Sequence, residues 1–125
     1  MAEASPWIAV VDDDPAVLKA LSRLLRAHAF HARTYGSGQD FLAALPAGLP
    51  ACLIVDLQMP GMNGLELQQH LISNGIQIPT ILITAHGDVA LRDQAGLVAS
   101  LRKPLQEKAL FDAIDRAVGD SRSAG

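Results

Sequence analysis

The sequence is poor in aromatic residues and in cysteine, and it has no long uninterrupted apolar segment. Only 4% of the 125 residues are aromatic although 50% are hydrophobic, so Leu, Ile, Val and Ala must build any core. Cys52 is the only cysteine, which excludes a disulfide within the chain, and its place in an apolar run predicts a small buried hydrophobe. No window reaches the roughly 18 apolar residues that a membrane-spanning helix needs.

An excess of positive charge is also missing. The net charge is -3 and the pI is about 5.7. These values argue against direct nucleic-acid binding by this domain, because such binding needs clustered Lys and Arg. Residues 1–6 lack the basic start and the following apolar segment of a secretory signal. We therefore expect a soluble, cytoplasmic domain with no membrane contact.

Short apolar runs alternate with segments whose apolar residues recur every three or four positions. The runs are bounded by Gly, Pro or Asp and have the length of buried strands. They predict strands at residues 7–11, 30–35, 52–56, 79–84 and 97–101. The periodic segments predict helices from 15 to about 26, at 39–45, at 64–73, at 88–94 and at about 106–118.

This alternation predicts one α/β domain over residues 7–118, built on a doubly wound five-stranded parallel sheet. The stretches 1–6 and 119–125 are expected to be short flexible tails. The strand at 30–35 is more polar than the others, which suits the edge of a sheet. Asp14 before Pro15 fits a helix N-cap followed by proline at the first helical position.

Polar residues stand where the predicted strands end. Asp12 and Asp13 follow the first strand, Asp56 ends the third, Thr84 ends the fourth, and Lys103 follows the fifth. In a parallel sheet all these ends lie at one edge, where open α/β sheets place their ligand sites. Clustered carboxylates repel one another, and a divalent cation with oxygen ligands relieves that repulsion. Because no Cys or His is offered there, Mg²⁺ fits the cluster better than zinc.

Asp56 is the candidate nucleophile of this cluster. A carboxylate that is partly neutralised by metal can attack phosphorus. Phosphoryl transfer needs mainly in-line positioning and neutralisation of the equatorial oxygens, and the ammonium of Lys103 supplies part of that charge. The hydroxyl of Thr84 can donate to a phosphoryl oxygen. Asp56, Thr84 and Lys103 are therefore the candidate catalytic residues.

Four segments together give the chain a strong likeness to a known family. They are Val-Val-Asp-Asp-Asp-Pro at 10–15, Asp-Leu-Gln-Met-Pro-Gly-Met-Asn-Gly at 56–64, Ile-Thr-Ala-His-Gly-Asp-Val at 83–89 and Lys-Pro at 103–104. In this order they resemble a two-component response-regulator receiver domain over about residues 7–118. The run at 84–89 is most similar to the nitrogen-fixation regulator subfamily.

The resemblance implies a flavodoxin-like fold of strand order 2-1-3-4-5. It also implies that Asp56 accepts a phosphoryl group from a sensor histidine kinase, while Thr84 and Lys103 contact that group. The domain would then be a phosphoprotein of a phosphorelay and not a conventional enzyme, since only its own Mg²⁺-dependent phosphorylation and dephosphorylation are expected. The Lys103–Pro104 bond is often cis in such domains. The downstream output partner is unknown, and a monomer or weak dimer is expected.

The same resemblance implies the metal ligands. Asp13, Asp56 and the backbone carbonyl of Gln58 are expected to bind Mg²⁺, and Asp12 is expected to act mostly through water. Gln58 and His86, each two residues after a site residue, are expected to tune the lifetime of the phosphoryl group.

The chain departs from the family pattern at three places. Receivers usually carry Tyr or Phe three residues before the lysine, whereas this chain has Ser100. Leu105 stands where a Phe usually follows the proline. The separation between Thr84 and Lys103 is shorter than usual, so a shortened fourth helix is expected between them. These departures predict intact phosphorylation chemistry with an atypical output face.

Two other functions remain open at this point. One is a phosphorylation-independent interaction module with a receiver fold, which absence of Mg²⁺ binding would favour. The other is a phosphohydrolase of the haloacid-dehalogenase type, which also uses an aspartyl nucleophile and Mg²⁺. Asp12 and Asp14 have the spacing of that family's motif, but Pro15 and Ala16 depart from it and the length leaves no room for a cap domain.

Overall fold

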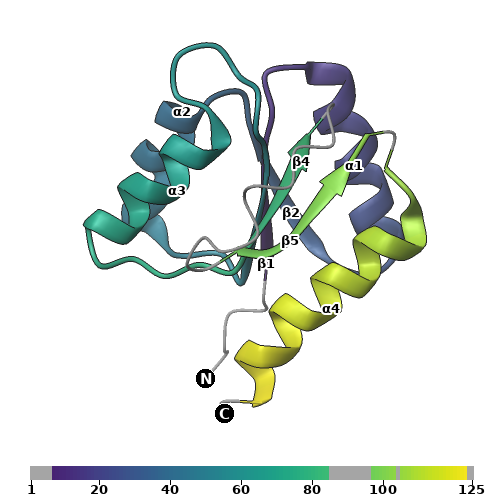
Figure 1. The fold of residues 1–125 in the computed structure, drawn as a ribbon. Helices are drawn as coiled ribbons and strands as arrows, with labels where there is room; N and C mark the ends of the chain where they lie inside the picture. The colour runs from purple at the N-terminus through teal and green to yellow at the C-terminus, as the bar shows by residue number, and fades with distance from the viewer. Residues whose placement is uncertain (1–6, 85–96, 104, 124–125) are drawn as a thin grey trace.

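The computed structural model describes residues 7–84, 97–103 and 105–123 of the chain (Figure 1). The helix expected at 88–94, the role expected for His86 and the Lys103–Pro104 bond all fall outside these residues.

The described residues form alternating strands and helices in the predicted order. The strands are β1 (Trp7–Val11), β2 (His31–Tyr35), β3 (Cys52–Asp56), β4 (Thr80–Thr84) and β5 (Leu97–Arg102). The helices are α1 (Pro15–Ala27), α2 (Gly38–Ala44), α3 (Gly64–Ser73) and α4 (Glu107–Ser123), with a short 3-10 helix, η1 (Leu45–Ala47), after α2. The bounds of every strand lie within one residue of the prediction.

The strands form a single parallel sheet of order β2-β1-β3-β4-β5, as predicted. Helices α2 and α3 cover one face of the sheet, and α1 and α4 cover the other (Figure 1). All residues of β3 and β4 are buried, whereas the edge strand β2 is largely exposed. Because every strand runs the same way, the carboxyl ends of the strands meet at one edge of the sheet.

Local signals fix where the helices begin. The Asp14 side chain accepts the backbone N–H of Ala16 at 2.9 Å, and Pro15 opens α1 as predicted. Helix α3 begins with a capping box in which Asn63 and Glu66 exchange side-chain and backbone hydrogen bonds of 2.8 and 2.9 Å. Helix α1 therefore starts soon after the end of β1, and α3 starts after the seven-residue segment 57–63 that follows β3.

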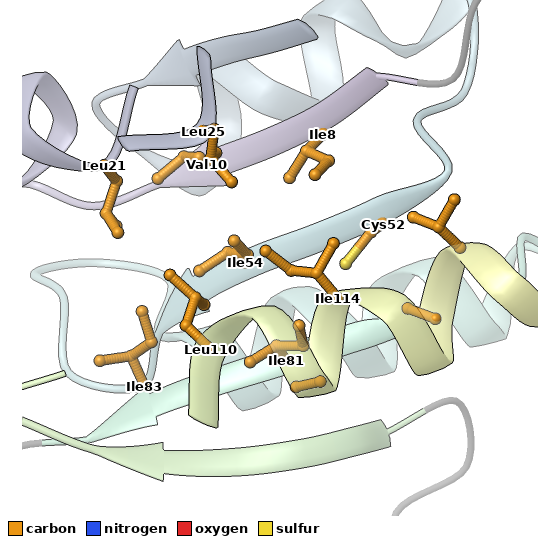
Figure 2. Close-up of a cluster of buried hydrophobic side chains, with 13 residues drawn as sticks. Ile8, Val10, Leu21, Leu25, Cys52, Ile54, Ile81, Ile83, Leu110 and Ile114 are labelled. Carbon is orange, nitrogen blue, oxygen red and sulfur yellow. The ribbon is translucent and has the colours of Figure 1, made fainter. Parts of the chain in front are cut away.

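Two hydrophobic layers fill the space between the sheet and its helices. Figure 2 shows the layer beneath α1 and α4, where Ile54 and Ile81 of the sheet lie opposite Leu110 and Ile114 of α4. Cys52 belongs to this layer as a buried free thiol, and burial raises its pKa to about 12. The prediction of a small buried residue at Cys52 is confirmed.

The last helix runs further than the sequence predicted. The expected helix ended near residue 118 and left a tail at 119–125, but α4 continues to Ser123, so that prediction is wrong over 119–123. The last apolar residue of the periodic pattern is Val118, and the residues after it are small or polar. Glycine stops a helix by adopting a left-handed backbone conformation, and Gly119 does not adopt one. Inside the helix it costs only about 1 kcal/mol relative to alanine.

We expect the central strand to be the position most sensitive to truncation. Ile54 is fully buried, so Ile54→Ala removes packed methyl groups and is expected to lower the free energy of unfolding by about 3 kcal/mol. Leu49 is 53% exposed, and the matched variant Leu49→Ala is expected to change it by less than about 0.5 kcal/mol. Urea denaturation followed by circular dichroism measures both values. Equal losses in the two variants would contradict this account of the core.

Candidate functional site

The polar residues predicted at the strand ends do converge at one edge of the sheet. Asp12 directly follows β1, Asp56 ends β3, Thr84 ends β4, and Lys103 directly follows β5. The ladder between β4 and β5 continues to the site, since the Lys103 N–H donates to the Thr84 carbonyl at 2.8 Å. The topology of the sheet thus brings together residues that are up to 91 positions apart in the chain (12 to 103).

Three carboxylates crowd together at this edge. One carboxylate oxygen from each of Asp12, Asp13 and Asp56 lies within 4.8 Å of the others. Asp12 is 1% exposed and Asp56 is 5% exposed, whereas Asp13 is exposed to solvent. Burial of like charges at such distances is costly unless a cation offsets them.

Lys103 is the cation that faces the cluster. Its Nζ donates to Asp56 Oδ2 at 3.2 Å and lies 3.6 Å from Asp12 Oδ2, a distance that makes an ion pair but not a good hydrogen bond. The Lys103 side chain is 31% exposed, so solvent screens part of this attraction. One ammonium group therefore stands against two buried carboxylates.

Backbone hydrogen bonds hold both buried carboxylates in the same way. The Asp14 N–H donates to Asp12 Oδ1 at 2.9 Å, and the Gln58 N–H donates to Asp56 Oδ1 at 3.0 Å. Each aspartate thus closes a turn with the residue two positions later. In both residues Oδ1 is fixed by the backbone, and Oδ2 is the oxygen nearest to Lys103 Nζ.

The donor set fits a hard divalent cation. Asp12 Oδ2 is buried and accepts no hydrogen bond from any residue that the structure describes. A buried carboxylate oxygen in this state calls for a positive ligand. Among the described residues the cluster consists of carboxylates alone, and carboxylate oxygens are the ligands that Mg²⁺ prefers.

The charges at the site shift the pKa values of two of its groups. Burial raises the pKa of Asp12; the hydrogen bond from Asp14 opposes this rise, and repulsion from Asp56 adds to it. Partial burial lowers the pKa of Lys103, but its hydrogen bond to Asp56 and the charge of Asp12 act the other way and leave that pKa above its ordinary value. The lysine is therefore held in its charged form.

The remaining predicted residues lie near this cluster in different settings. Thr84 is buried at the end of β4, and Gln58 is exposed in the segment that follows β3. Ser100 is exposed on β5, paired in register with Leu82. Leu105 is half-buried and packs against the layer under α4, so it takes part in the core.

Gly64 has a role that the sequence did not reveal. It opens α3, as the predicted helix at 64–73 implies, and its φ is not positive. A Cβ on Gly64 would lie 2.7 Å from the Asp56 carbonyl oxygen, a distance at which backbone must move. Glycine therefore allows α3 to approach the peptide of Asp56. One feature of the sequence could have indicated this role. A glycine inside a predicted helix is not needed for the backbone conformation there, which suggests a close contact with another segment.

Comparison with known proteins identifies the family. The model of the response regulator receiver domain matches residues 8–115. The chain belongs to this family. Receiver domains bind Mg²⁺ at an acidic pocket, and sensor histidine kinases phosphorylate response regulators. The acidic cluster of Asp12, Asp13 and Asp56 lies where this pocket is expected.

Several proteins are similar over most of this receiver domain. The response regulator protein TodT of Pseudomonas putida is 38% identical over 94% of this chain and 53% of its own length. The transcriptional regulatory protein FixJ of Rhizobium meliloti is 38% identical over 86% of this chain and 54% of its own length. The crystal structure of FixJ-N is 35% identical with a TM-score of 0.83, and it covers 94% of this chain and 96% of that one. The predicted likeness to nitrogen-fixation regulators is confirmed.

The receiver domain spans about half the length of the curated relatives that it matches. Among the described residues, no helix is both long enough and apolar enough to cross a membrane.

We expect the buried carboxylate of Asp12 to destabilise the metal-free domain. The pKa of Asp12 is higher in the folded state than in the unfolded state. Its protonated form therefore stabilises the fold at a pH below its pKa in the unfolded chain, and this stabilisation is lost as the pH rises through its pKa in the folded protein. Asp12→Asn keeps an Oδ1 acceptor for Asp14 but removes the charge, so the free energy of unfolding at neutral pH is expected to rise by about 1 kcal/mol. The gain is expected to shrink as the pH is lowered.

Denaturation in the presence of EDTA across a pH series measures this effect. Asp13→Asn is the matched control, because Asp13 is exposed and little change is expected there. A metal-free Asp12→Asn variant that is less stable than the wild type at neutral pH would contradict the argument, since the ion pair with Lys103 would then outweigh the cost of burial.

Proposed function

We propose that this receiver domain accepts a phosphoryl group on Asp56 from the phosphohistidine of a sensor kinase, in a Mg²⁺-dependent reaction. One observation carries the proposal: three carboxylate oxygens lie within 4.8 Å, and the Lys103 ammonium lies 3.2 Å from Asp56 Oδ2. A site that only capped a helix would need one carboxylate and no lysine.

Asp13, Asp56 and the backbone carbonyl of Gln58 would hold the metal, with Asp12 acting through water. When bound, Mg²⁺ would neutralise charge on the carboxylates and on the incoming phosphoryl oxygens. The domain's own groups set the geometry. The Gln58 N–H fixes Asp56 Oδ1, and the approach of α3 at Gly64 holds the peptide of Asp56 in place.

In the transfer, an oxygen of the Asp56 carboxylate forms a bond to phosphorus as the bond from phosphorus to the histidine nitrogen breaks. Lys103 would then exchange its contact with Asp56 Oδ2 for one with a phosphoryl oxygen, and the Thr84 hydroxyl would donate to another. These contacts neutralise charge on the equatorial oxygens, which is most of what phosphoryl transfer needs. Water later cleaves the acyl phosphate and restores the carboxylate.

We further propose that the signal leaves this domain through an atypical output face, with no aromatic switch. Position 100, where receivers usually have a ring, is an exposed serine. No aromatic residue occurs between Phe41 and Phe111 in the sequence. The chain has five rings, and each makes another contact: Tyr35 with Phe41, Phe30 with Phe111, and Trp7 with Arg33.

The acceptor role can be tested with a small phosphodonor. After incubation with Mg²⁺ and acetyl phosphate or phosphoramidate, we expect the intact mass to increase by one phosphoryl group, and the Asp56→Asn variant to show no adduct. Beryllofluoride binding followed by NMR distinguishes rapid hydrolysis from absence of reaction. Absence of both a phosphoryl adduct and beryllofluoride binding would contradict the proposal and favour a phosphorylation-independent interaction module.

Lys103 is expected to affect metal binding and phosphorylation in opposite directions. Lys103→Met removes a positive charge that competes for the same carboxylates, so the affinity for Mg²⁺ is expected to rise roughly three- to tenfold. Phosphorylation is expected to slow, because the variant cannot neutralise a phosphoryl oxygen. Calorimetric titration and the rate of adduct formation measure the two effects. Lys108→Met is the matched control, since Lys108 pairs with Asp112 away from the site. A fall in both quantities would contradict the assigned role.

A further inference from the structure

Gly38 and Met62 form a close contact that the proposed chemistry does not use. Gly38 is the buried first residue of α2, and Met62 is a half-buried residue between β3 and α3. A Cβ on Gly38 would lie 3.1 Å from Met62 Sδ, 3.5 Å from Cγ and 3.6 Å from Cβ. Three side-chain atoms of Met62 therefore surround the place that a Gly38 Cβ would take.

Met62, and not the backbone conformation, is what a side chain at position 38 would meet. The φ of Gly38 lies outside the left-handed range, so any residue could adopt its conformation. Gly36 stands two residues earlier in the same Gly-Ser-Gly turn, and a Cβ there would have nothing within 4 Å. Gly36 is exposed and precedes the helix, whereas Gly38 is buried, opens α2 and has Met62 beside it.

The segment that carries Met62 also carries Gln58. Residues 57–63 join β3 to α3, and both ends of this segment are held. Met59 is 9% exposed in the core, and Asn63 is fixed by its capping box with Glu66. Between these points the segment turns at Gly61, which has φ +78°. Contact with Gly38 holds this middle part from the side of α2.

We infer that Gly38 and Met62 are positioning residues for the metal site: the packing of Met62 on Gly38 sets the path of the 57–63 segment and therefore the position of the Gln58 carbonyl. This inference rests on the proposed Mg²⁺-dependent function. Mg²⁺ demands near-ideal octahedral geometry, so a small displacement of one ligand weakens binding. Groups that orient ligands without touching the metal commonly change affinity by roughly 10- to 100-fold when they are altered.

The contact can be tested by adding one methyl group on either side of Ser37. In Gly38→Ala the Cβ would lie too close to Met62 Sδ, so the side chain must move, and the segment anchored at Met59 and Asn63 absorbs the displacement. We expect the affinity for Mg²⁺, measured by calorimetric titration, to fall roughly tenfold. The matched variant Gly36→Ala is expected to bind Mg²⁺ like the wild type.

Stability separates positioning from general damage. Replacing glycine by alanine restricts the unfolded chain and favours a helix, so Gly38→Ala is not expected to lower the melting temperature by more than Gly36→Ala does. A metal-free readout is also available, since the Gln58 amide signal in the ¹H–¹⁵N NMR spectrum is expected to shift in Gly38→Ala but not in Gly36→Ala.

A double variant tests whether the effect of Gly38→Ala on Mg²⁺ binding acts through Met62. Met62→Val removes the Sδ atom, so the double variant Gly38→Ala/Met62→Val accommodates the new methyl group and is expected to recover most of the lost affinity. If the double variant binds Mg²⁺ as weakly as Gly38→Ala alone, the inference is overturned.

Two further outcomes distinguish this inference from the proposed function. Normal Mg²⁺ binding by wild type, Gly36→Ala and Gly38→Ala alike would overturn the inference and leave the proposed function in place. Absence of Mg²⁺ binding by the wild type would overturn the proposed function, and the inference with it.

Discussion

The crowding of negative charge at the carboxyl edge of the sheet is the constraint on which the rest of the site depends. Asp12 and Asp56 are buried almost completely, and Lys103 is the cation placed between them. One ammonium does not balance two buried carboxylates and a third at the rim. Repulsion between the carboxylates is therefore unfavourable in the metal-free domain. A bound cation or a transferred phosphoryl group would change this repulsion, so the free energy of the site depends on its ligands.

The parallel sheet brings these repelling carboxylates together at one edge. The backbone of β3 and β4 is buried on both faces, so the layers of apolar side chains hold the strand ends rigidly. Asp14 and Gln58 then fix one oxygen of each buried aspartate through backbone hydrogen bonds. Both buried aspartates are thus held at the base of the site, whereas the Lys103 side chain is 31% exposed at its opening.

Much of this arrangement could be predicted from the sequence, because it follows from patterns that repeat along the chain. The buried strands were evident from apolar runs such as 52–56, and a parallel sheet brings Asp56 and Lys103 to one edge whatever the details of packing. The close approaches of Gly64 to Asp56 and of Gly38 to Met62 could not be predicted. Such contacts depend on distances between separate segments and leave no periodic trace. The extent of α4 was missed because residues 119–123 are small or polar and do not continue the apolar periodicity that marks the helix.

The scarcity of aromatic residues bears directly on how a signal could leave the domain. An aromatic ring is large enough that its movement between two positions produces two different packing arrangements. The serine at position 100 is too small to do this. No Phe, Tyr or Trp lies on β4 or β5, and the ring contacts of the chain's five such residues are with one another, with His28 or with Arg33. The segment after β3 is one element at the site, and the contact between Met62 and Gly38 joins it to α2. It therefore offers one route from the site to the face formed by α2 and α3.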